Sequence, residues 1–281
     1  MITIQNAKLT VAVSLLGAEL QSVKDGAGKE RLWQGDAQFW TGRAPVLFPF
    51  AGSLKDGYCL HEGKKWHLPQ HGFARKSLFQ VKEQHGDSVT LLLDTPHAEY
   101  PFAYALLLRY TLVENAIKVE YIVQNNGETT MYYGIGCHEA YALPETFESY
   151  QLLFDEKETL VRNLLEGAQI TTNTEVLSTD TREFPLKEKY FYADDSIVLL
   201  HTNSKALTLE TTKSNDKIRV EYPGFDNLLI WKKENAPYIC IEPWVNPPEY
   251  TTSNHILAEK PGIVALPAKQ EKIHTHIITI L

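Results

Sequence analysis

Alternation of apolar and polar residues with a period of two dominates this chain. Along residues 116–125 the positions expected to face a core are Ile117, Val119, Tyr121 and Val123. This pattern predicts a strand with one buried face, because successive side chains of a strand point to opposite faces of the sheet. Residues 104–113 carry a second strand-like run, and the short segment between the two runs predicts a tight hairpin turn at Glu114 and Asn115.

Similar short runs recur along the whole chain. They predict strands at residues 2–4, 9–15, 88–93, 196–201, 206–211, 217–222, 228–231, 238–241 and 272–280. Turn residues separate many of them, as in Asn125-Asn126-Gly127 and Pro223-Gly224. Helical signals are few: residues 36–40 fit one turn, and residues 159–165 fit either a helix or a strand. Many short strands with regular turns predict an all-β antiparallel sandwich or barrel.

The pattern runs through the chain with no Ser, Gly or Pro-rich linker, internal repeat or low-complexity segment. We therefore expect one large β domain over residues 1–281. No glycine-rich phosphate loop joins a strand to a helix, so a dinucleotide or nucleotide site is not expected.

Composition and charge exclude several classes of binding partner. The formal net charge of -8 and the lack of Lys/Arg runs argue against nucleic acid or an anionic membrane surface. No stretch approaches the roughly 20 apolar residues that span a bilayer, and the N-terminal residues lack the basic and apolar order of a signal peptide. The three widely spaced cysteines, Cys59, Cys137 and Cys240, fit reduced thiols. A cytoplasmic protein is expected.

Two residues far apart in sequence stand in distinctive settings. His138 lies in Gly136-Cys137-His138-Glu139, and Glu242 lies in Ile241-Glu242-Pro243-Trp244 at the end of an apolar run. A carboxylate at the mouth of a buried strand is costly unless it is hydrogen-bonded or takes part in chemistry. A histidine and a carboxylate together supply a general acid and a general base, and an adjacent aromatic ring suits the flat face of a sugar.

Five segments in order carry a wider pattern. They are residues 42–49 (Gly-Arg-Ala-Pro-Val-Leu-Phe-Pro), 68–75 (Leu-Pro-Gln-His-Gly-Phe-Ala-Arg), 136–138 (Gly-Cys-His), 223–225 (Pro-Gly-Phe) and 239–244 (Ile-Cys-Ile-Glu-Pro-Trp). Together they resemble the aldose 1-epimerase (galactose mutarotase) superfamily, and more narrowly its LacX-like branch. The resemblance implies a large antiparallel β-supersandwich and an isomerase that interconverts the α and β anomers of a hexose such as galactose or glucose.

The resemblance also implies roles. His138 is the implied general acid and Glu242 the implied general base, while Arg43 and His71 are implied to bind sugar hydroxyls. Ring opening and closure exchange only protons, so no cofactor or metal is expected, and activity should survive EDTA. A sugar-binding aspartate of the family corresponds only loosely to one of two neighbouring residues, Asp194 and Asp195.

The chain departs from the family pattern beside the site. Glu139 stands where the family usually has proline, Cys137 stands where a glycine is common, and Val245-Asn246 replaces a Tyr-Gly-like pair. We expect a nearby Glu139 charge to raise the pKa of His138. The departures bear on substrate preference more than on the reaction.

Other interpretations remain open. A hexose-phosphate mutarotase requires a basic pocket, for which Arg43, Arg75 and Lys55 are candidates, and a non-catalytic carbohydrate-binding protein on the same fold is the third possibility. His61 and His67, with His71, match no standard zinc spacing, so no metal site is expected there. A small-molecule sugar is the expected partner of a monomer or weak homodimer.

Overall fold

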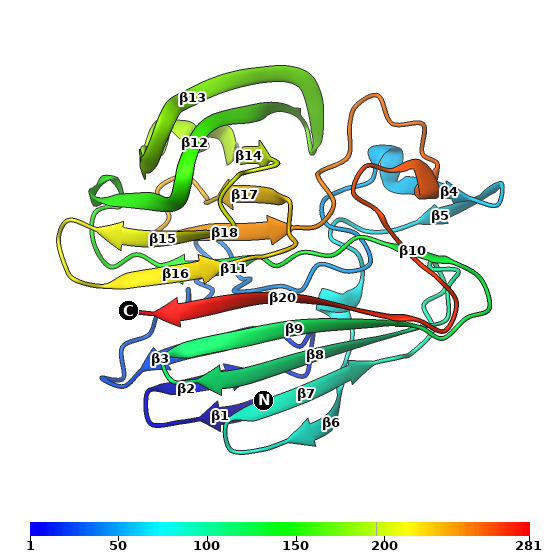
Figure 1. The fold of residues 1–281 in the computed structure, drawn as a ribbon, viewed down its shortest axis with the longest axis horizontal. Helices are drawn as coiled ribbons and strands as arrows, with labels where there is room; N and C mark the ends of the chain where they lie inside the picture. Colours follow the sequence, from blue (N-terminus) through cyan, green and yellow to red (C-terminus); the bar gives the residue numbers. More distant parts are fainter. Residues whose placement is uncertain (195) are drawn as a thin grey trace.

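The computed structural model shows an all-β fold built from large antiparallel sheets (Figure 1). It describes residues 1–194 and 196–281, and the side chains of residues 193 and 194 lie outside that description. One sheet of thirteen strands dominates. Its order is β11 (Glu139–Ala142), β18 (Tyr238–Trp244), β17 (Asn227–Trp231), β14 (Ile197–Leu200), β12 (Tyr150–Glu166), β15 (Ala206–Thr211), β16 (Lys217–Glu221), β20 (Glu271–Ile280), β9 (Ala116–Asn125), β8 (Tyr104–Val113), β7 (Ser88–Leu93) and β6 (Gln80–Gln84), with β13 (Gln169–Pro185) paired to β12. The predicted β-supersandwich is confirmed.

Three smaller sheets contain the remaining described strands. They are β1 (Ile2–Gln5), β2 (Leu9–Val13) and β3 (Leu20–Asp25); β4 (Tyr58–His61) with β5 (Lys64–His67); and β10 (Met131–Tyr133) with β19 (Val264–Leu266). Helical structure among the described residues is limited to five short 3-10 turns: η1 (Lys55–Gly57), η2 (Ala74–Lys76), η3 (Phe147–Ser149), η4 (Glu188–Asp194) and η5 (Leu257–Glu259). No helix in the described ranges is long and apolar enough to cross a membrane.

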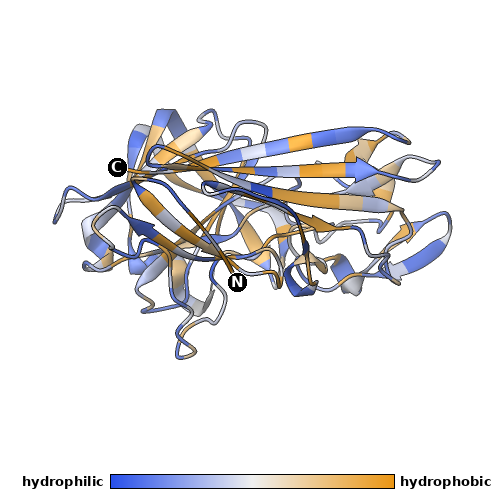
Figure 2. Ribbon diagram, turned by 90° about the horizontal axis from the view of Figure 1, so that it is seen from below, coloured by the Kyte–Doolittle hydropathy of each residue, from blue (hydrophilic) through white to orange (hydrophobic). Residues whose placement is uncertain are grey.

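The C-terminal strand β20 joins the two halves of the large sheet, because it pairs with β16 on one side and β9 on the other. The side chains predicted from the alternation to face a core do so: the main core includes Ile117, Val119, Tyr121 and Val123. That core also takes side chains from β1, β2 and β3 and from the site end of the sheet. Figure 2 shows the same mixture of hydrophobic and hydrophilic positions along the strands.

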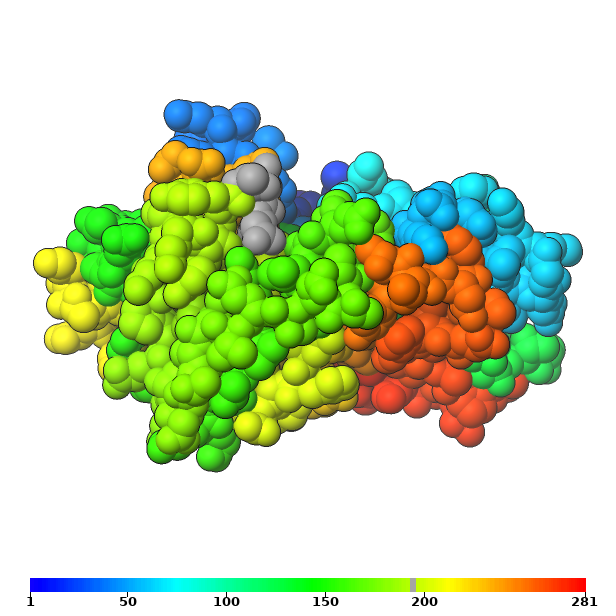
Figure 3. Space-filling view, turned by 90° about the horizontal axis from the view of Figure 1, so that it is seen from above, coloured from blue at the N-terminus to red at the C-terminus, as the bar shows by residue number. Residues whose placement is uncertain are grey.

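A long hairpin extends from this framework. Strands β12 and β13 each contain 17 residues and pair with several register shifts. The turn between them reaches the segment after β18, where Ile170 bridges Tyr250 and its N–H donates to the Glu249 carbonyl at 2.9 Å. Figure 3 shows the hairpin, in green, lying against that segment, in orange. The hairpin turn is thereby held beside strands β17 and β18, where it lines a cavity.

Candidate active site

A cavity of about 350 Å³ lies over one face of strands β17 and β18. Its size falls at the small end of the roughly 300–1,000 Å³ typical of ligand pockets, which suits a monosaccharide. The residues that line it include Trp40, Gly52, Ser53, Gln70, His71, Arg75, His138, Leu165, Gly167, Ala168, Ser196, Val198, Leu229, Trp231, Lys233, Glu242, Trp244 and Pro248. The turn of the β12–β13 hairpin supplies Gly167 and Ala168 to its wall.

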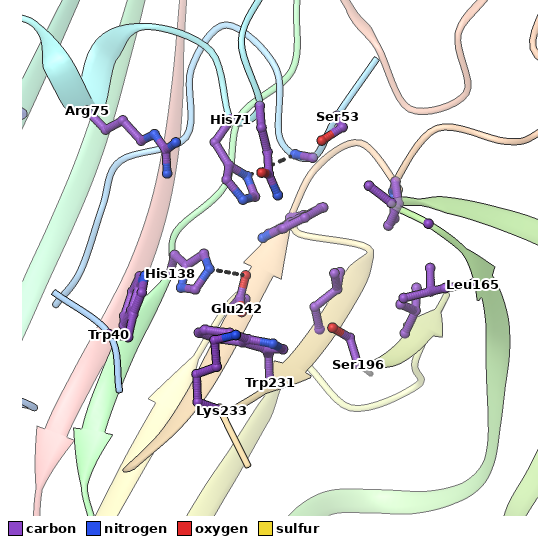
Figure 4. A pocket seen from close by; sticks show the side chains of 18 residues that line it. Trp40, Ser53, His71, Arg75, His138, Leu165, Ser196, Trp231, Lys233 and Glu242 are labelled. Atoms are coloured by element: carbon purple, nitrogen blue, oxygen red, sulfur yellow. Dashed lines mark hydrogen bonds and ion pairs between the residues drawn. The ribbon is translucent and has the colours of Figure 1, made fainter. Parts of the chain in front are cut away.

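The sheet register brings His138 and Glu242 together. Glu139 pairs with Ile241 within β11 and β18, and Gly136 forms an antiparallel bridge with Trp244. Continuing the same register places His138 directly opposite Glu242, and opposed residues of an antiparallel pair point to the same face. His138 Nε2 lies 3.4 Å from Glu242 Oε2 (Figure 4). Glu242 lies within β18 and His138 directly precedes β11, so the sheet brings together two residues that are 104 positions apart in sequence.

Glycines before His138 make room for its neighbours. A Cβ atom on Gly136 would lie 2.6 Å from Cδ1 of Trp244, and one on Gly134 would lie 2.0 Å from Oδ1 of Asn246. Asn246 in turn donates to the Ala51 carbonyl at 2.9 Å. The two glycines are therefore explained by packing, because larger side chains would displace Asn246 and would push Trp244 away from the cavity wall.

Burial sets the protonation of the pair. His138 is 7% exposed and Glu242 is 2% exposed. Desolvation lowers the pKa of His138 to about 4 and outweighs the opposing effect of the Glu139 charge. Desolvation, with the Glu139 charge added, raises the pKa of Glu242 well above its usual range, while the Trp244 side chain acts the other way. Glu139 thus acts on His138 in the predicted direction, but the net shift is downward.

His71 is fixed by two hydrogen bonds to one residue. Its backbone N–H donates to the Gly52 carbonyl at 2.7 Å, and the Gly52 N–H donates to His71 Nδ1 at 3.1 Å. Because Nδ1 accepts, the ring proton of the neutral imidazole is assigned to Nε2. Burial and the nearby His138 and Arg75 hold the pKa of His71 well below its usual range. His71 is therefore a neutral donor at the cavity wall.

Aromatic rings surround the pair. The Trp40 indole stacks on His138 with ring centroids 5.0 Å apart, and Trp231 meets the same imidazole edge-on at 5.7 Å. Trp244 stands nearly perpendicular to His71 at 5.6 Å. These three indoles give the cavity apolar faces.

The structure places the two arginines of the motif segments differently. Arg43 is absent from the described cavity lining, and its guanidinium donates to the Gln21 side chain and, at 2.8 Å, to the Gln34 carbonyl. Arg75, from η2, lines the cavity instead, and its buried Nε has no hydrogen-bond partner among the described residues. Figure 4 shows Arg75 and His71 on one side of the cavity and Trp231 and Lys233 on the other. Asp195 and the Asp194 side chain lie outside the described residues.

Sequence reasoning did not assign several pocket residues. Trp40 follows the turn at Asp36, and Lys233 follows β17, so neither belongs to a motif segment. The Leu165 side chain and the hairpin turn reach the cavity only because β12 is long and curved. Of these residues, Trp40 is interpreted from sequence as core or rim packing rather than a ligand platform, and the structure places it in the cavity lining.

Comparison with known proteins identifies the family. The aldose 1-epimerase profile matches residues 1–255. The chain belongs to the aldose 1-epimerase family. It is 32% identical to the plasmid-encoded and chromosomal forms of protein LacX of Lactococcus lactis subsp. lactis, over 100% of this chain and 99% of each relative.

Solved structures show the same relationship. A galactose mutarotase related enzyme from Lactobacillus acidophilus superposes with a TM-score of 0.92 at 30% identity, over 100% of this chain and 97% of that one. A galactose mutarotase-like protein from Lactobacillus casei gives 0.94 at 26% identity and covers both chains completely. The predicted family and fold are confirmed by these matches.

Proposed function

We propose that this protein is a mutarotase, an isomerase that interconverts the α and β anomers of a hexose such as galactose or glucose. The observation that carries the proposal is the His138–Glu242 pair, 3.4 Å apart in a cavity of monosaccharide size. Membership of the aldose 1-epimerase family supports it. A binding site alone does not require an acid and a base side by side.

Ring opening needs one proton taken from the C1 hydroxyl and one proton given to the ring oxygen. The pKa directions favour neutral His138 and protonated Glu242. From that state Glu242 protonates the ring oxygen while His138 accepts the hydroxyl proton, and the C1–O5 bond breaks. After rotation about C1–C2, Glu242 takes its proton back as the ring closes and His138 returns the other to the C1 oxygen.

The family resemblance implies the opposite starting roles, with His138 as the acid and Glu242 as the base. In that state the same single proton starts on His138 instead of on Glu242. Each residue acts once as acid and once as base in a full turnover, so the pair works from either distribution. The remaining groups orient the sugar: His71 donates from Nε2, Arg75 offers several N–H groups, and the three indoles cover apolar faces.

Polarimetry tests the proposal. Freshly dissolved α-D-galactose and α-D-glucose should lose optical rotation much faster with the wild-type protein than without it. His138→Ala should lower the catalysed rate by about 10²- to 10⁴-fold, the usual contribution of general acid–base catalysis. Equal rates for the variant and the wild type would remove His138 from the mechanism.

A second candidate function is mutarotation of a hexose phosphate. The observation that favours it is the Arg75 guanidinium at the cavity wall, with Lys233 on the opposite side. Guanidinium groups bind phosphate through paired N–H donors. The other candidates from sequence lie elsewhere: Arg43 bonds Gln21 and Gln34, and Lys55 donates to the Ser253 carbonyl at 3.2 Å. Faster turnover of glucose 6-phosphate than of glucose would favour this function.

A further inference from the structure

Cys240 is a buried thiol beside the catalytic pair that the proposed mechanism does not use. It lies two residues before Glu242 on β18, so both side chains point to the same face of the sheet. Its partner in the register is Ala140, which carries only a methyl group. One donor atom from each of Cys240, His138 and Glu242 lies within 4.8 Å of the other two.

This donor set matches the preferences of zinc. Zn²⁺ binds thiolate, imidazole and carboxylate groups, and tetrahedral ligands at about 2.0–2.3 Å from the metal lie roughly 3.3–3.7 Å from one another. The 3.4 Å between His138 Nε2 and Glu242 Oε2 already has that spacing. Three protein ligands with one open position form the arrangement of accessible zinc sites.

A second cluster of possible metal ligands differs from the Cys240 cluster in its access to the cavity. Cys137, Glu139 and His276 also bring their donor atoms within 4.8 Å, but they face the core on the other side of β11. None of these three is among the described residues that line the cavity, whereas His138 and Glu242 both line it. The cavity therefore gives an ion access to two of the three ligands of the Cys240 cluster, while Cys240 itself is fully buried and is not a lining residue.

We propose that His138, Cys240 and Glu242 form a zinc site whose occupation inhibits the enzyme. Zinc displaces the thiol and carboxyl protons, which go to solvent, and takes the imidazole lone pair. Its fourth position faces the cavity. The same two groups cannot bind zinc and exchange protons with a sugar, so zinc and substrate exclude each other.

Direct binding measurements test the site without any sugar. The full-length protein, freed of metal with EDTA, should bind one equivalent of Zn²⁺ in competition with a chromophoric chelator. Cys240→Ser should weaken zinc binding by at least about 100-fold, since removing a ligand costs no less than removing its supporting group. Cys59→Ser is the matched control, a buried thiol outside both clusters, and should bind as the wild type does.

Cobalt identifies the thiolate ligand even if Cys240→Ser does not fold. A Cys59→Ser/Cys137→Ser double variant has Cys240 as its only thiol. With Co²⁺ it should keep the near-ultraviolet thiolate-to-cobalt absorption of the wild type. Loss of that absorption in the double variant, or no zinc binding by the wild type, overturns the proposal. Loss of zinc in Cys137→Ser with retention in Cys240→Ser places the ion in the core cluster and overturns it as well.

The inhibitory consequence alone rests on the proposed function. Zinc should slow mutarotation by the wild type and the double variant, each compared with itself in EDTA, and should slow Cys240→Ser much less. Rising sugar concentration should relieve the inhibition. A protein that binds zinc through Cys240 but never accelerates mutarotation would refute the proposed function and leave the zinc site standing. Mutarotation that zinc leaves unchanged while it occupies the site overturns the inhibition.

Discussion

At the scale of single residues, burial shifts the pKa values of the two central side chains. A histidine in water has a pKa near the working pH, whereas burial brings that of His138 to about 4. Burial moves the pKa of Glu242 in the opposite direction. Because both shifts favour the neutral forms, one proton is shared by two groups that lie 3.4 Å apart. That shared proton is what a reversible ring opening needs.

The first prediction concerns Arg75. Arg75→Met should lower kcat/KM about 10- to 100-fold for the preferred sugar, because a charged donor to the substrate contributes about 1.5–3 kcal/mol. Steady-state polarimetry at several sugar concentrations measures the change. If the substrate is a hexose phosphate, the loss should be larger for the phosphorylated sugar than for the free one.

Arg43→Met is the matched variant. The family resemblance assigned sugar binding to Arg43, but its guanidinium bonds Gln21 and Gln34 away from the described cavity lining. Its kcat/KM should therefore fall less than that of Arg75→Met. A larger loss in Arg43→Met would contradict the placement and support sugar binding by Arg43.

At the scale of elements, the predictable strands were those with runs of buried apolar residues. Residues 88–93, 104–113 and 206–211 form strands with the predicted ends, and the hairpin at Glu114 and Asn115 is confirmed. Strand β13 was not predicted, because most of its side chains are exposed or half-exposed and no buried face produces alternation. Residues 159–165, ambiguous in sequence, belong to β12. The one-turn helix expected at residues 36–40 is a hydrogen-bonded turn.

The site was predictable only where a motif holds the residue. His71, His138 and Glu242 line one cavity because the register of β11 and β18 and the bonds to Gly52 bring them together. Which arginine reaches the cavity depends on the direction of its side chain. The segment Gly42-Arg43-Ala44 gives no sign that the Arg43 guanidinium bonds Gln21 and Gln34. The roles of these residues stay proposals.

Gly72 tests the loop that holds His71. Its φ is +68°, and a Cβ there would lie 2.2 Å from the Phe48 carbonyl oxygen. Gly72→Ala should lower the free energy of unfolding by at least about 3 kcal/mol, combining left-handed strain with a backbone clash. Urea denaturation measures the loss.

The control for Gly72 is Gly63, which has a φ of +73° and no described heavy atom within 4 Å of the position that an added Cβ would take. Gly63→Ala should cost about 1–2 kcal/mol, the strain alone. Equal losses in the two variants would show that the clash with Phe48 is relieved, and that this close approach does not fix the His71 loop.

At the scale of the whole molecule, the large sheet connects the site to the rest of the fold. Strand β20 pairs with both halves, and one core cluster takes side chains from the N-terminal sheet and from β18. The continuous sheet supports the expectation of a single domain over residues 1–281, which stays a prediction. So do the cytoplasmic location and the monomeric or weakly dimeric state.

Core histidines predict how stability depends on pH. His274 is buried and its Nε2 lies 2.8 Å from the Tyr133 hydroxyl, and burial lowers its pKa from 6.5 to about 4. Between these values the unfolded chain binds a proton that the folded protein does not. Stability from this group is therefore complete above pH 6.5 and decreases as the pH falls toward 4.

His274→Gln measures this effect. Between pH 7 and pH 5 the wild type should lose about 2 kcal/mol more unfolding free energy than the variant, from about 1.36 kcal/mol per pH unit over roughly 1.5 units. An identical pH dependence in His274→Gln and the wild type would show that His274 titrates normally in the folded protein.

The most direct test of the central claim is anomer exchange measured by NMR at equilibrium, with galactose and glucose, in EDTA, for the wild type and Glu242→Gln. We predict exchange between the α and β signals with the wild type and a loss of at least about 10²-fold in the variant. Sugar affinity of the variant should stay within about tenfold of the wild type, because the proton-transfer and binding roles separate. Wild-type exchange rates in Glu242→Gln would contradict the assignment of the His138–Glu242 pair as the catalytic centre.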